Sequence, residues 1–333
     1  MTGVIRTTVV GSYPVPGGLT EASLDGALTS LLRKQEDCGI DVITDGELLR
    51  FDPSHPETNG MIETFVVPLD GVATDMTDAE AATFAARAGV TFRRRPPGIV
   101  RQPIGRGSLD LATAWHHAQD LTEHPVKLTL TSPYMLAKTL MDAHYGDLSA
   151  LTFAIADALA DAVREVPASV VQVDEANLTG HPEDAPWAVE TMNRVLDAAS
   201  GERGVHLCFG NYGGKTIQEG FWRDLVPHLD ALHADHLILE TARRDPAELE
   251  QLRPLRDDLG LGIGVIDIKD ARVETPGEVA DRIASAVTVL GADRVRWVHP
   301  DCGFWMLTPE VADAKMGALG EGRDLYLGRA GGG

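Results

Sequence analysis

Residues 262–298, which read GIGVIDIKDARVETPGEVADRIASAVTVLGADRVRWV, contain the pattern that decides the fold. The apolar run Gly262–Ile266 has the composition of a strand that is buried on both faces. Pro276–Leu290 has the spacing of an amphipathic helix, and the Thr-Pro pair at its start is a typical helix beginning. A second apolar run, Val295–Val298, follows shortly after. Strand, helix and strand in this order predict two parallel strands joined by a crossover helix.

The same alternation of short apolar runs and longer amphipathic stretches extends over the whole chain. The predicted strands are Ile5–Val10, Asp41–Thr44, Val126–Thr131, Ser169–Val173, Val205–Cys208, His236–Leu239, Gly262–Ile266 and Val295–Val298. The predicted helices are Glu21–Asp37, Ala150–Glu165, Trp187–Ala199, Gln218–Leu232, Pro246–Leu259 and Pro276–Leu290. Eight strands, most of them followed by a helix, predict an α/β protein with a (β/α)8 TIM barrel. We expect a single catalytic domain over residues 1–333.

One connection interrupts the alternation. About eighty residues separate the second and third predicted strands, and they include a helix-like stretch near Thr77–Ala88 and a basic, proline-rich stretch, Arg93–Pro97. A connection of this length in a compact domain is usually a functional insertion with structure of its own. We expect residues 50–122 to form this insertion and to act as a lid over the mouth of the barrel.

Composition restricts the class of protein and its partners. The chain has 29 basic and 50 acidic residues, and the net charge of −21 argues against binding to nucleic acid or to an anionic membrane. No apolar run approaches the roughly 18 residues of a transmembrane helix, and the first residues do not resemble a signal peptide. The three cysteines are too few for a disulfide framework, so we expect a cytoplasmic protein.

Four residues at predicted strand ends form a metal-ligand pattern. His206 and Cys208 end the fifth strand, Glu240 follows the sixth, and Cys302 follows the eighth. Residues i and i+2 of a strand point to the same face, so His206 and Cys208 can both face the barrel axis. Two thiolates, an imidazole and a carboxylate suit tetrahedral zinc. The alternative is that both cysteines and His206 are ordinary core residues, but their joint position at the strand ends favours a Zn²⁺ site.

Short motifs at the strand ends match those of a known family in the same order. They are Thr8-Val9-Val10-Gly11-Ser12-Tyr13-Pro14, Asp45-Gly46-Glu47, Asn59-Gly60-Met61, Leu130-Thr131-Ser132-Pro133, Val171-Gln172-Val173-Asp174-Glu175, His206-Leu207-Cys208, Leu239-Glu240-Thr241-Ala242-Arg243, Gly264-Val265-Ile266-Asp267-Ile268 and Pro300-Asp301-Cys302-Gly303. Through these motifs the chain resembles the catalytic C-terminal barrel of the cobalamin-independent methionine synthases, as a short, single-domain member.

The resemblance implies a zinc-dependent S-methyltransferase that converts homocysteine to methionine. The four metal-ligand residues match the zinc ligands of the family, whose metal binds the homocysteine sulfur. Ser12, Glu47 and Asp174 match the positions that hold the amino-acid end of this substrate. We expect the two carboxylates to bind its ammonium group and Ser12 to bind its carboxylate. The structural alternatives are a surface charge for Glu47 and a helix N-cap for Asp174.

The match to the family breaks at position 269. The family places a histidine there, after the strand-seven motif, and this residue is thought to handle a proton. Here Lys269 occupies the position and is followed by Asp270. We expect Lys269 to take over the proton transfer and Asp267 to orient it. The alternative is an ion pair of Lys269 with Asp267 or Asp270.

The methyl donor is the second point where the chain departs from the family. Folate-dependent members carry a tryptophan shortly after the third-strand turn, and this chain has Thr139 there. We therefore expect poor use of methyltetrahydrofolate, and a methyl-corrinoid, a corrinoid protein or another small methyl donor in its place, with folate as the donor that stays open. Two alternatives stay open. One is zinc-dependent alkyl transfer from an epoxide to another small thiol, and the other is a zinc-binding barrel without catalytic activity.

Overall fold

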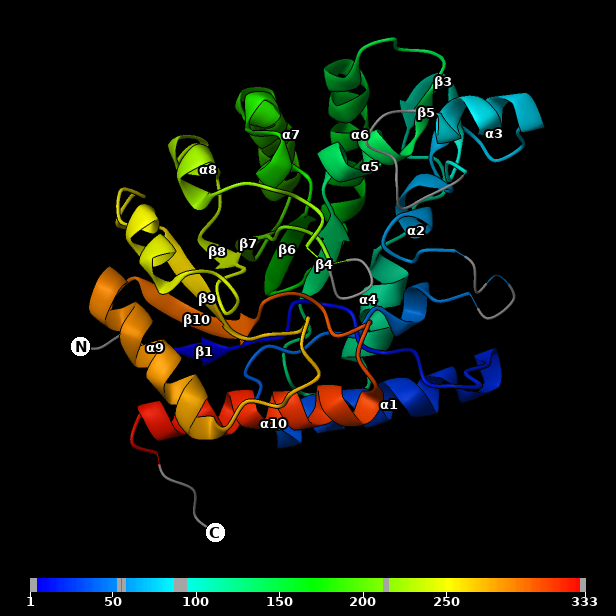
Figure 1. The fold of residues 1–333 in the computed structure, drawn as a ribbon. Coiled ribbons are helices and arrows are strands. Elements are labelled where there is room, and N and C mark those ends of the chain that lie inside the picture. Colours follow the sequence, from blue (N-terminus) through cyan, green and yellow to red (C-terminus); the bar gives the residue numbers. More distant parts are fainter. Residues whose placement is uncertain (1–4, 53–54, 56–57, 87–94, 212–215, 330–333) are drawn as a thin grey trace.

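The barrel is closed by parallel strand pairing around its whole circumference. The computed structural model describes residues 5–52, 55, 58–86, 95–211 and 216–329. Seven strands form one parallel sheet in the order β1-β10-β9-β8-β7-β6-β4. They are β1 (Arg6–Thr7), β4 (Leu128–Thr131), β6 (Val170–Glu175), β7 (Glu202–Leu207), β8 (His236–Leu239), β9 (Gly260–Ile266) and β10 (Val295–Pro300). Val42 and Ile43 complete the barrel, because they bridge Thr8 and Val126 in parallel. The predicted α/β barrel is confirmed (Figure 1).

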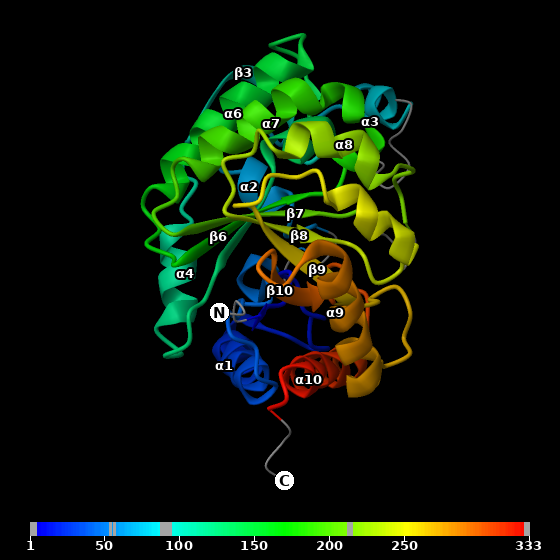
Figure 2. The same cartoon turned by 90° about the vertical axis from the view of Figure 1, so that its left-hand side faces the viewer.

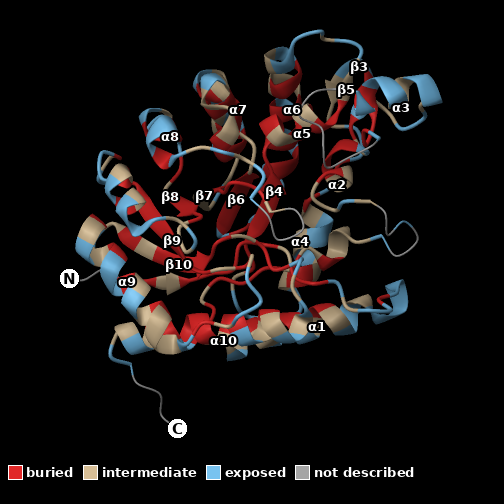
Figure 3. Ribbon diagram, in the orientation of Figure 1, coloured by how far each residue is buried: buried red, intermediate tan, exposed pale blue. Residues whose placement is uncertain are grey.

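Helices surround the strands and cover their outer side (Figures 1 and 2). They are α1 (Glu21–Asp37), α5 (Pro133–Thr139), α6 (Leu148–Val163), α7 (Ala185–Leu196), α8 (Trp222–Leu229), α9 (Pro276–Leu290) and α10 (Pro309–Tyr326). Short 3-10 helices are η1 (Leu48–Arg50), η2 (Leu178–Gly180), η3 (Pro182–Asp184) and η4 (Pro246–Leu252). Buried residues fill the strands and the inward helix faces, and exposed residues lie on the outer helix faces (Figure 3). None of the described helices is long and apolar enough to cross a membrane.

Several predicted elements are shorter than expected, and the strand predicted over Ile5–Val10 is only Arg6–Thr7. The strand predicted over Asp41–Thr44 is reduced to the two bridging residues described above. The helix predicted over Gln218–Leu232 begins only at Trp222, and Pro227 inside it removes one backbone donor. The helix predicted over Pro246–Leu259 is the 3-10 helix η4, which ends at Leu252. The connections to the next strands are therefore irregular at these points.

The insertion between the second and third strands has a sheet of its own. Its further elements are α2 (Glu63–Val66), β2 (Asp70–Ala73), α3 (Asp78–Ala85), β3 (Ile99–Gly105) and α4 (Ala112–Gln119). β3 pairs with β2 in antiparallel and with β5 (Met141–Asp142) in parallel. Because β5 follows β4 and α5 in the chain, this pairing ties the insertion to the barrel.

Different parts of the insertion contact different parts of the barrel. The small sheet packs against α6, at one edge of the molecule (Figure 1). The segment before it reaches the strand ends, where Thr131 Oγ1 donates to the carbonyl of Met61 at 2.6 Å. The guanidinium of Arg50 donates to the carbonyl and the hydroxyl of Thr129. Arg50 and Met61 thus contact the strands at the barrel mouth, and the function of the insertion as a lid stays a prediction.

The barrel interior changes from apolar to polar towards the C-terminal ends of the strands. Val10, Val42, Val170, Ile238 and Trp297 form one apolar cluster. Further along the strands the buried side chains are polar, and they are Lys127, Gln172, His206 and His299. Side chains two residues apart on a strand point to the same side, so the polar series continues the apolar one. The strands thus deliver polar groups to one end of the barrel.

We expect Gly204→Ala to destabilise the protein by about 1–3 kcal/mol, the usual cost of overpacking. A Cβ at residue 204 would lie 2.6 Å from Nε2 of His236. That ring is buried and packs against Trp297 at 5.0 Å between centroids, so it has little room to move. Urea unfolding measures the effect. Gly317→Ala in α10 is the control, because nothing lies within 4 Å of its Cβ position. A Gly204→Ala protein as stable as the control would contradict this packing.

Candidate metal centre and amino-acid pocket

Three of the four predicted metal ligands come together at the C-terminal ends of the strands. His206 lies in β7, Cys208 follows β7, and Cys302 follows β10. The ligand atoms of these three residues all lie within 4.8 Å of one another. The two Sγ atoms are 3.9 Å apart. Tetrahedral zinc with Zn–S bonds of about 2.3 Å places two sulfurs ~3.8 Å apart, so the thiol pair fits this metal.

His206 presents one ring nitrogen to the two thiols. Nδ1 lies 3.0 Å from the carbonyl oxygen of Ile238, and it donates because a carbonyl can only accept. Nε2 is buried and has no hydrogen-bond partner among the described residues. Burial lowers the pKa of His206 to about 3, so the ring is neutral and Nε2 carries a lone pair. Orphaned buried acceptors are rare, and a metal ion would satisfy this one.

The thiols are in an environment that favours a cation between them. The contact with Cys302, followed by burial, raises the pKa of the Cys208 thiol well above its usual range. The Cys208 thiolate therefore does not form readily without a positive charge close by. A divalent metal supplies this charge and deprotonates coordinating thiols. The donor set and its burial fit zinc.

Both carboxylate oxygens of Glu240, the predicted fourth ligand, have hydrogen-bond partners of their own. Its Oε1 accepts a hydrogen bond from Nζ of Lys269 at 2.7 Å, and its Oε2 accepts one from the backbone N–H of Phe209 at 3.0 Å. The side chains of Glu240 and Lys269 are 1% and 0% exposed. In the part of the chain that the structure describes, Glu240 is not a member of the metal-ligand group.

Lys269 therefore has a different partner from the two that the sequence suggested. Its ammonium contacts Glu240 and the hydroxyl of Thr216, at 3.1 Å from the latter. Asp267 accepts the backbone N–H of Lys269 at 2.8 Å and pairs with Arg243 at 3.3 Å. Asp267 thus fixes the turn that carries Lys269, which agrees with the orienting role expected for it.

The two carboxylates predicted to bind an ammonium group lie in the barrel mouth. Asp174 is the fifth residue of β6 and is 4% exposed. Glu47 approaches Gly11 so closely that a Cβ there would lie 2.5 Å from its Oε1. Burial, and secondly the charge of Glu47, raise the pKa of Asp174 to about 7. The two groups form a negative pocket that a cation would stabilise.

The backbone at Glu47 is unusual. Its φ is +60°, in the left-handed region, and no other non-glycine residue in the described ranges has a positive φ. Gly46 before it has a φ of +64°. This turn directs the carboxylate inward, where it lies 3.4 Å from a guanidinium nitrogen of Arg50. Glu47 is therefore a pocket residue and not a surface charge.

Ser12 connects the pocket to the metal-ligand group. Its side chain packs directly against Cα of Gly303, which leaves no room for a Cβ there. Its carbonyl accepts the backbone N–H of Phe304 at 2.8 Å. Since Cys302 directly precedes Gly303, Ser12 on the loop after β1 lies beside the loop that carries this cysteine. The predicted substrate residues and three metal ligands thus share one end of the barrel.

The sequence did not reveal that a basic side chain, that of Lys127, lies close to the two carboxylates of the pocket. Nζ of Lys127 donates to Gln172 at 2.5 Å, and Gln172 in turn donates to Asp174 at 2.6 Å. Burial lowers the pKa of Lys127 to about 7, while the nearby Asp174 and Glu47 act in the opposite direction. The signal for this chain of contacts is the period of two in β6, which places Gln172 and Asp174 on one face.

Asp301 is a second group that the sequence analysis did not assign. It is fully buried, and its carboxylate accepts the backbone N–H groups of Thr241 at 2.9 Å, Ala242 at 2.7 Å and Arg243 at 3.1 Å. These bonds join the loop after β8 to the loop after β10. Asp301 therefore fixes the position of Glu240 relative to Cys302.

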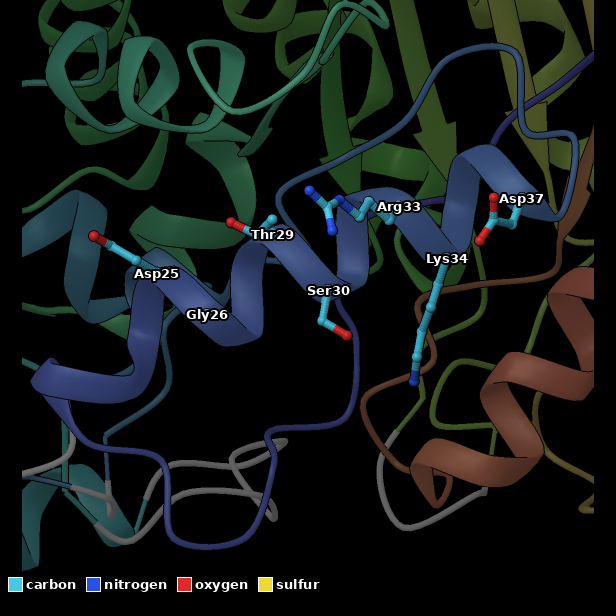
Figure 4. A pocket seen from close by; sticks show the side chains of 7 residues that line it. All are labelled: Asp25, Gly26, Thr29, Ser30, Arg33, Lys34 and Asp37. Carbon is cyan, nitrogen blue, oxygen red and sulfur yellow. The ribbon is translucent and has the colours of Figure 1, made fainter.

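A second group of possible ligand atoms and a surface hollow along α1 lack the features of a functional site. His181, Glu183 and Asp184 also form a group with possible ligand atoms, but Glu183 is exposed and Asp184 accepts the hydroxyl of Tyr134 at 2.6 Å. A hollow of about 490 Å³ lies along α1 (Figure 4). All of its lining residues come from this one helix, and they are Asp25, Gly26, Thr29, Ser30, Arg33, Lys34 and Asp37. The hollow includes no residue of the strand ends, so we assign no chemistry to it.

Comparison with known proteins agrees with this geometry. The family model described as the catalytic domain of cobalamin-independent synthase matches residues 17–321. The chain belongs to this family. This cobalamin-independent synthase domain is 27% identical to the methionine synthase of Sulfurisphaera tokodaii, over 94% of this chain and 90% of that protein. It is 26% identical to the methionine synthase of Saccharolobus solfataricus, over 96% of this chain and 94% of that one.

Solved structures show the same fold for this cobalamin-independent synthase domain. A B12-independent methionine synthase from Shewanella sp. W3-18-1, in complex with selenomethionine, has a TM-score of 0.80 at 22% identity and covers 98% of each chain. A methyltransferase from Methanosarcina mazei has a TM-score of 0.60 at 12% identity, over 98% of this chain and 95% of that one. Membership of the family makes the protein an enzyme of the methyltransferase class.

We expect Asp301→Asn to lower the free energy of unfolding by about 1–3 kcal/mol, because an amide cannot accept all three backbone N–H groups. Urea unfolding in the presence of a chelator measures this without any effect of metal loss. Asp245→Asn is the control, since Asp245 caps η4 in an exposed position where asparagine serves equally well. Equal stability of the two variants would show that Asp301 does not anchor the loop.

Proposed function

We propose that the protein is a zinc-dependent methyltransferase that methylates the sulfur of homocysteine to give methionine. The observation that carries this proposal is the juxtaposition of two features at one end of the barrel. The first is the buried group of His206, Cys208 and Cys302. The second is the negative pocket of Glu47 and Asp174. A thiol that also carries an ammonium group is complementary to both.

The metal-ligand group serves the sulfur of the substrate. His206, Cys208 and Cys302 would hold the zinc ion. When bound, zinc supplies the positive charge that keeps a substrate thiol ionised at neutral pH. Two protein thiolates reduce the net charge of the centre, which keeps a further thiolate nucleophilic enough for attack on a methyl group. The hydrogen bond from Nδ1 of His206 to Ile238 holds the ring in the orientation that this task requires.

The pocket serves the amino-acid end of the substrate. Glu47 and Asp174 bind and orient the ammonium group, and Ser12 accompanies the carboxylate. A bound ammonium offsets the repulsion between the two carboxylates, which favours the ionised form of Asp174. Arg50 contacts Glu47, and Lys127 is connected to Asp174 through Gln172. The pocket argues against a thiol that carries a sulfonate as the acceptor. The negative sulfonate would lie next to the carboxylates of Glu47 and Asp174 and be repelled by them.

The methyl donor that we propose is a methylfolate. The family is described as cobalamin-independent, which weighs against the corrinoid or corrinoid protein expected from the sequence. The sequence argument against folate depended on Thr139. That side chain is 2% exposed and donates to the carbonyl of Leu136, so it is buried within the protein. Trp305, on the loop after β10 and 40% exposed, offers an aromatic ring for stacking. Arg93 and Arg94 lie outside the described residues.

Zinc-loaded protein is expected to make methionine from homocysteine and methyltetrahydrofolate, with about one zinc ion per chain. Cys208→Ser and Cys302→Ser should each lose most of the metal and of the activity, since two thiolates bind zinc far more tightly than one. Metal analysis and a methionine assay measure both effects. Cys38→Ser is the matched control, because Cys38 ends α1 away from the group. Full metal content in the double variant would refute the site, and turnover with methylcobalamin alone would refute the donor.

Binding of methionine should weaken as the pH falls below about 7. The pKa of Asp174 is raised to about 7, so below this pH its proton must leave before the carboxylate can bind an ammonium group. The expected loss is about tenfold in affinity per pH unit. Methionine is the suitable probe because its sulfur carries no proton, and calorimetry between about pH 5.5 and 8 gives the constants. Asp174→Asn should bind more weakly with a flat profile; an unchanged slope would assign the effect to another group.

A further inference from the structure

Gln172 of β6 is fully buried, and both ends of its amide group are hydrogen-bonded. Its Oε1 accepts a hydrogen bond from Nζ of Lys127 at 2.5 Å. Its Nε2 donates to the carbonyl of Val10 at 2.8 Å and to Oδ1 of Asp174 at 2.6 Å. An amide NH2 group has two hydrogens to donate, so both are used. Since the site is buried, a group that loses its partner here is left unpaired at a cost in free energy.

The three partners of Gln172 allow one orientation of its amide. An ammonium group only donates hydrogen bonds, whereas a carbonyl and an ionised carboxylate only accept them. In the reverse orientation the amide oxygen would face the two acceptors, Val10 and Asp174, and the NH2 group would face the donor. Lys127 is 3% exposed and holds the amide oxygen on its own side. The orientation of Gln172 is therefore determined by the residues around it.

Gln172 connects the two segments that carry the proposed contacts to the amino-acid end of the substrate. Val10 precedes Ser12, the residue proposed for the carboxylate, by two positions. Asp174, proposed for the ammonium group, follows Gln172 by two positions in the same strand. An α-amino acid carries both of these groups on one carbon atom, so the two binding residues must keep a short and constant separation. A single amide that bonds to both segments sets this separation.

The same amide determines which oxygen of Asp174 is available to a ligand. Oδ1 is occupied by Gln172. Oδ2 has no hydrogen bond to any other residue that the structure describes, and Asp174 keeps a small exposed area. The bond to Oδ1 thus fixes the rotation of the carboxylate and leaves Oδ2 for an ammonium group. Binding groups that are held in advance in this way need little reorganisation when the ligand arrives.

We propose that Gln172 is a positioning residue that makes the pocket selective for α-amino acids, and that Lys127 holds its amide in the required orientation. The inference rests on the proposed function, because it takes the pocket to bind the amino-acid end of the substrate. Gln172 itself does not touch this substrate and acts through Asp174 and the segment of Val10. Its loss should therefore reduce the preference for ligands with an α-amino group and leave the metal content unchanged.

Calorimetry with two ligands tests this selectivity. Methionine and 4-(methylthio)butanoate differ only in the α-amino group, and the ratio of their dissociation constants measures the preference for it. At pH 8, above the raised pKa of Asp174, the zinc-loaded wild type should prefer methionine. In Gln172→Met this preference should fall about tenfold or more, the usual effect of losing a hydrogen bond to a charged group. Gln102→Met in the exposed part of β3 is the control and should keep the wild-type ratio.

A second variant keeps the test decisive if Gln172→Met fails to fold, since that variant leaves the buried Lys127 without its partner. Lys127→Met/Gln172→Met replaces both groups by apolar side chains of similar length, which is far less disruptive than removing one of them. It should lose the preference to the same extent. Equal weakening of both ligands leaves the ratio unchanged, and this result in the folded variants would overturn the inference alone. A wild type that does not prefer methionine would refute the amino-acid pocket of the proposed function as well.

Discussion

The parallel bridges of Val42 and Ile43 are the constraint on which the site depends. They are the weakest part of the barrel, since they connect β1 and β4 through two residues only. Without them the sheet would have two free edges, at Thr8 and at Val126. The loop after β1, which carries Ser12, would then be separated from the strand that leads to Asp174. Closure brings both to the ends of β7 and β10, where the metal-ligand group lies.

Charges inside the barrel mouth are stabilised in pairs and chains, since isolated buried charges are costly. Lys127, Gln172 and Asp174 form one chain, and Arg50 accompanies Glu47. Glu240 and Lys269 form another pair. Each of the two carboxylates in the barrel mouth is thus connected to a cation, Glu47 directly and Asp174 through Gln172. These contacts fix the orientation of both groups.

Much of the barrel was predictable from the sequence, because parallel strands buried on both faces read as apolar runs. Val205–Cys208 and Gly262–Ile266 are of this kind. The small sheet was not predictable, since β3 includes Arg101, Gln102 and Pro103 and is largely exposed. Its pairing with β5 also joins segments that are distant in the chain.

The site was also predictable only in part. The spacing of His206 and Cys208 and the position of Cys302 at another strand end were sufficient to predict the group that the structure contains. Glu240 was predicted as the fourth ligand from its position at the end of the neighbouring strand and from its motif, and its coordination of the metal stays a prediction. The sequence did not reveal that Lys269 reaches Glu240 from the loop after β9. The interpretation of Thr139 as a missing platform stays a prediction, since burial of this side chain does not show which residue would contact a donor. A position near a motif does not show which way its side chain points.

The left-handed backbone at Glu47 lowers the stability of the protein, while its side chain supplies a carboxylate to the pocket. A non-glycine residue in this region costs of the order of 1 kcal/mol relative to glycine, and asparagine also tolerates it well. A directed-evolution campaign that selects for heat resistance alone would therefore favour glycine or asparagine at position 47. Such a protein would keep its barrel and lose half of its negative pocket. Glutamate in this conformation is a mark of selection for ligand binding over thermal stability.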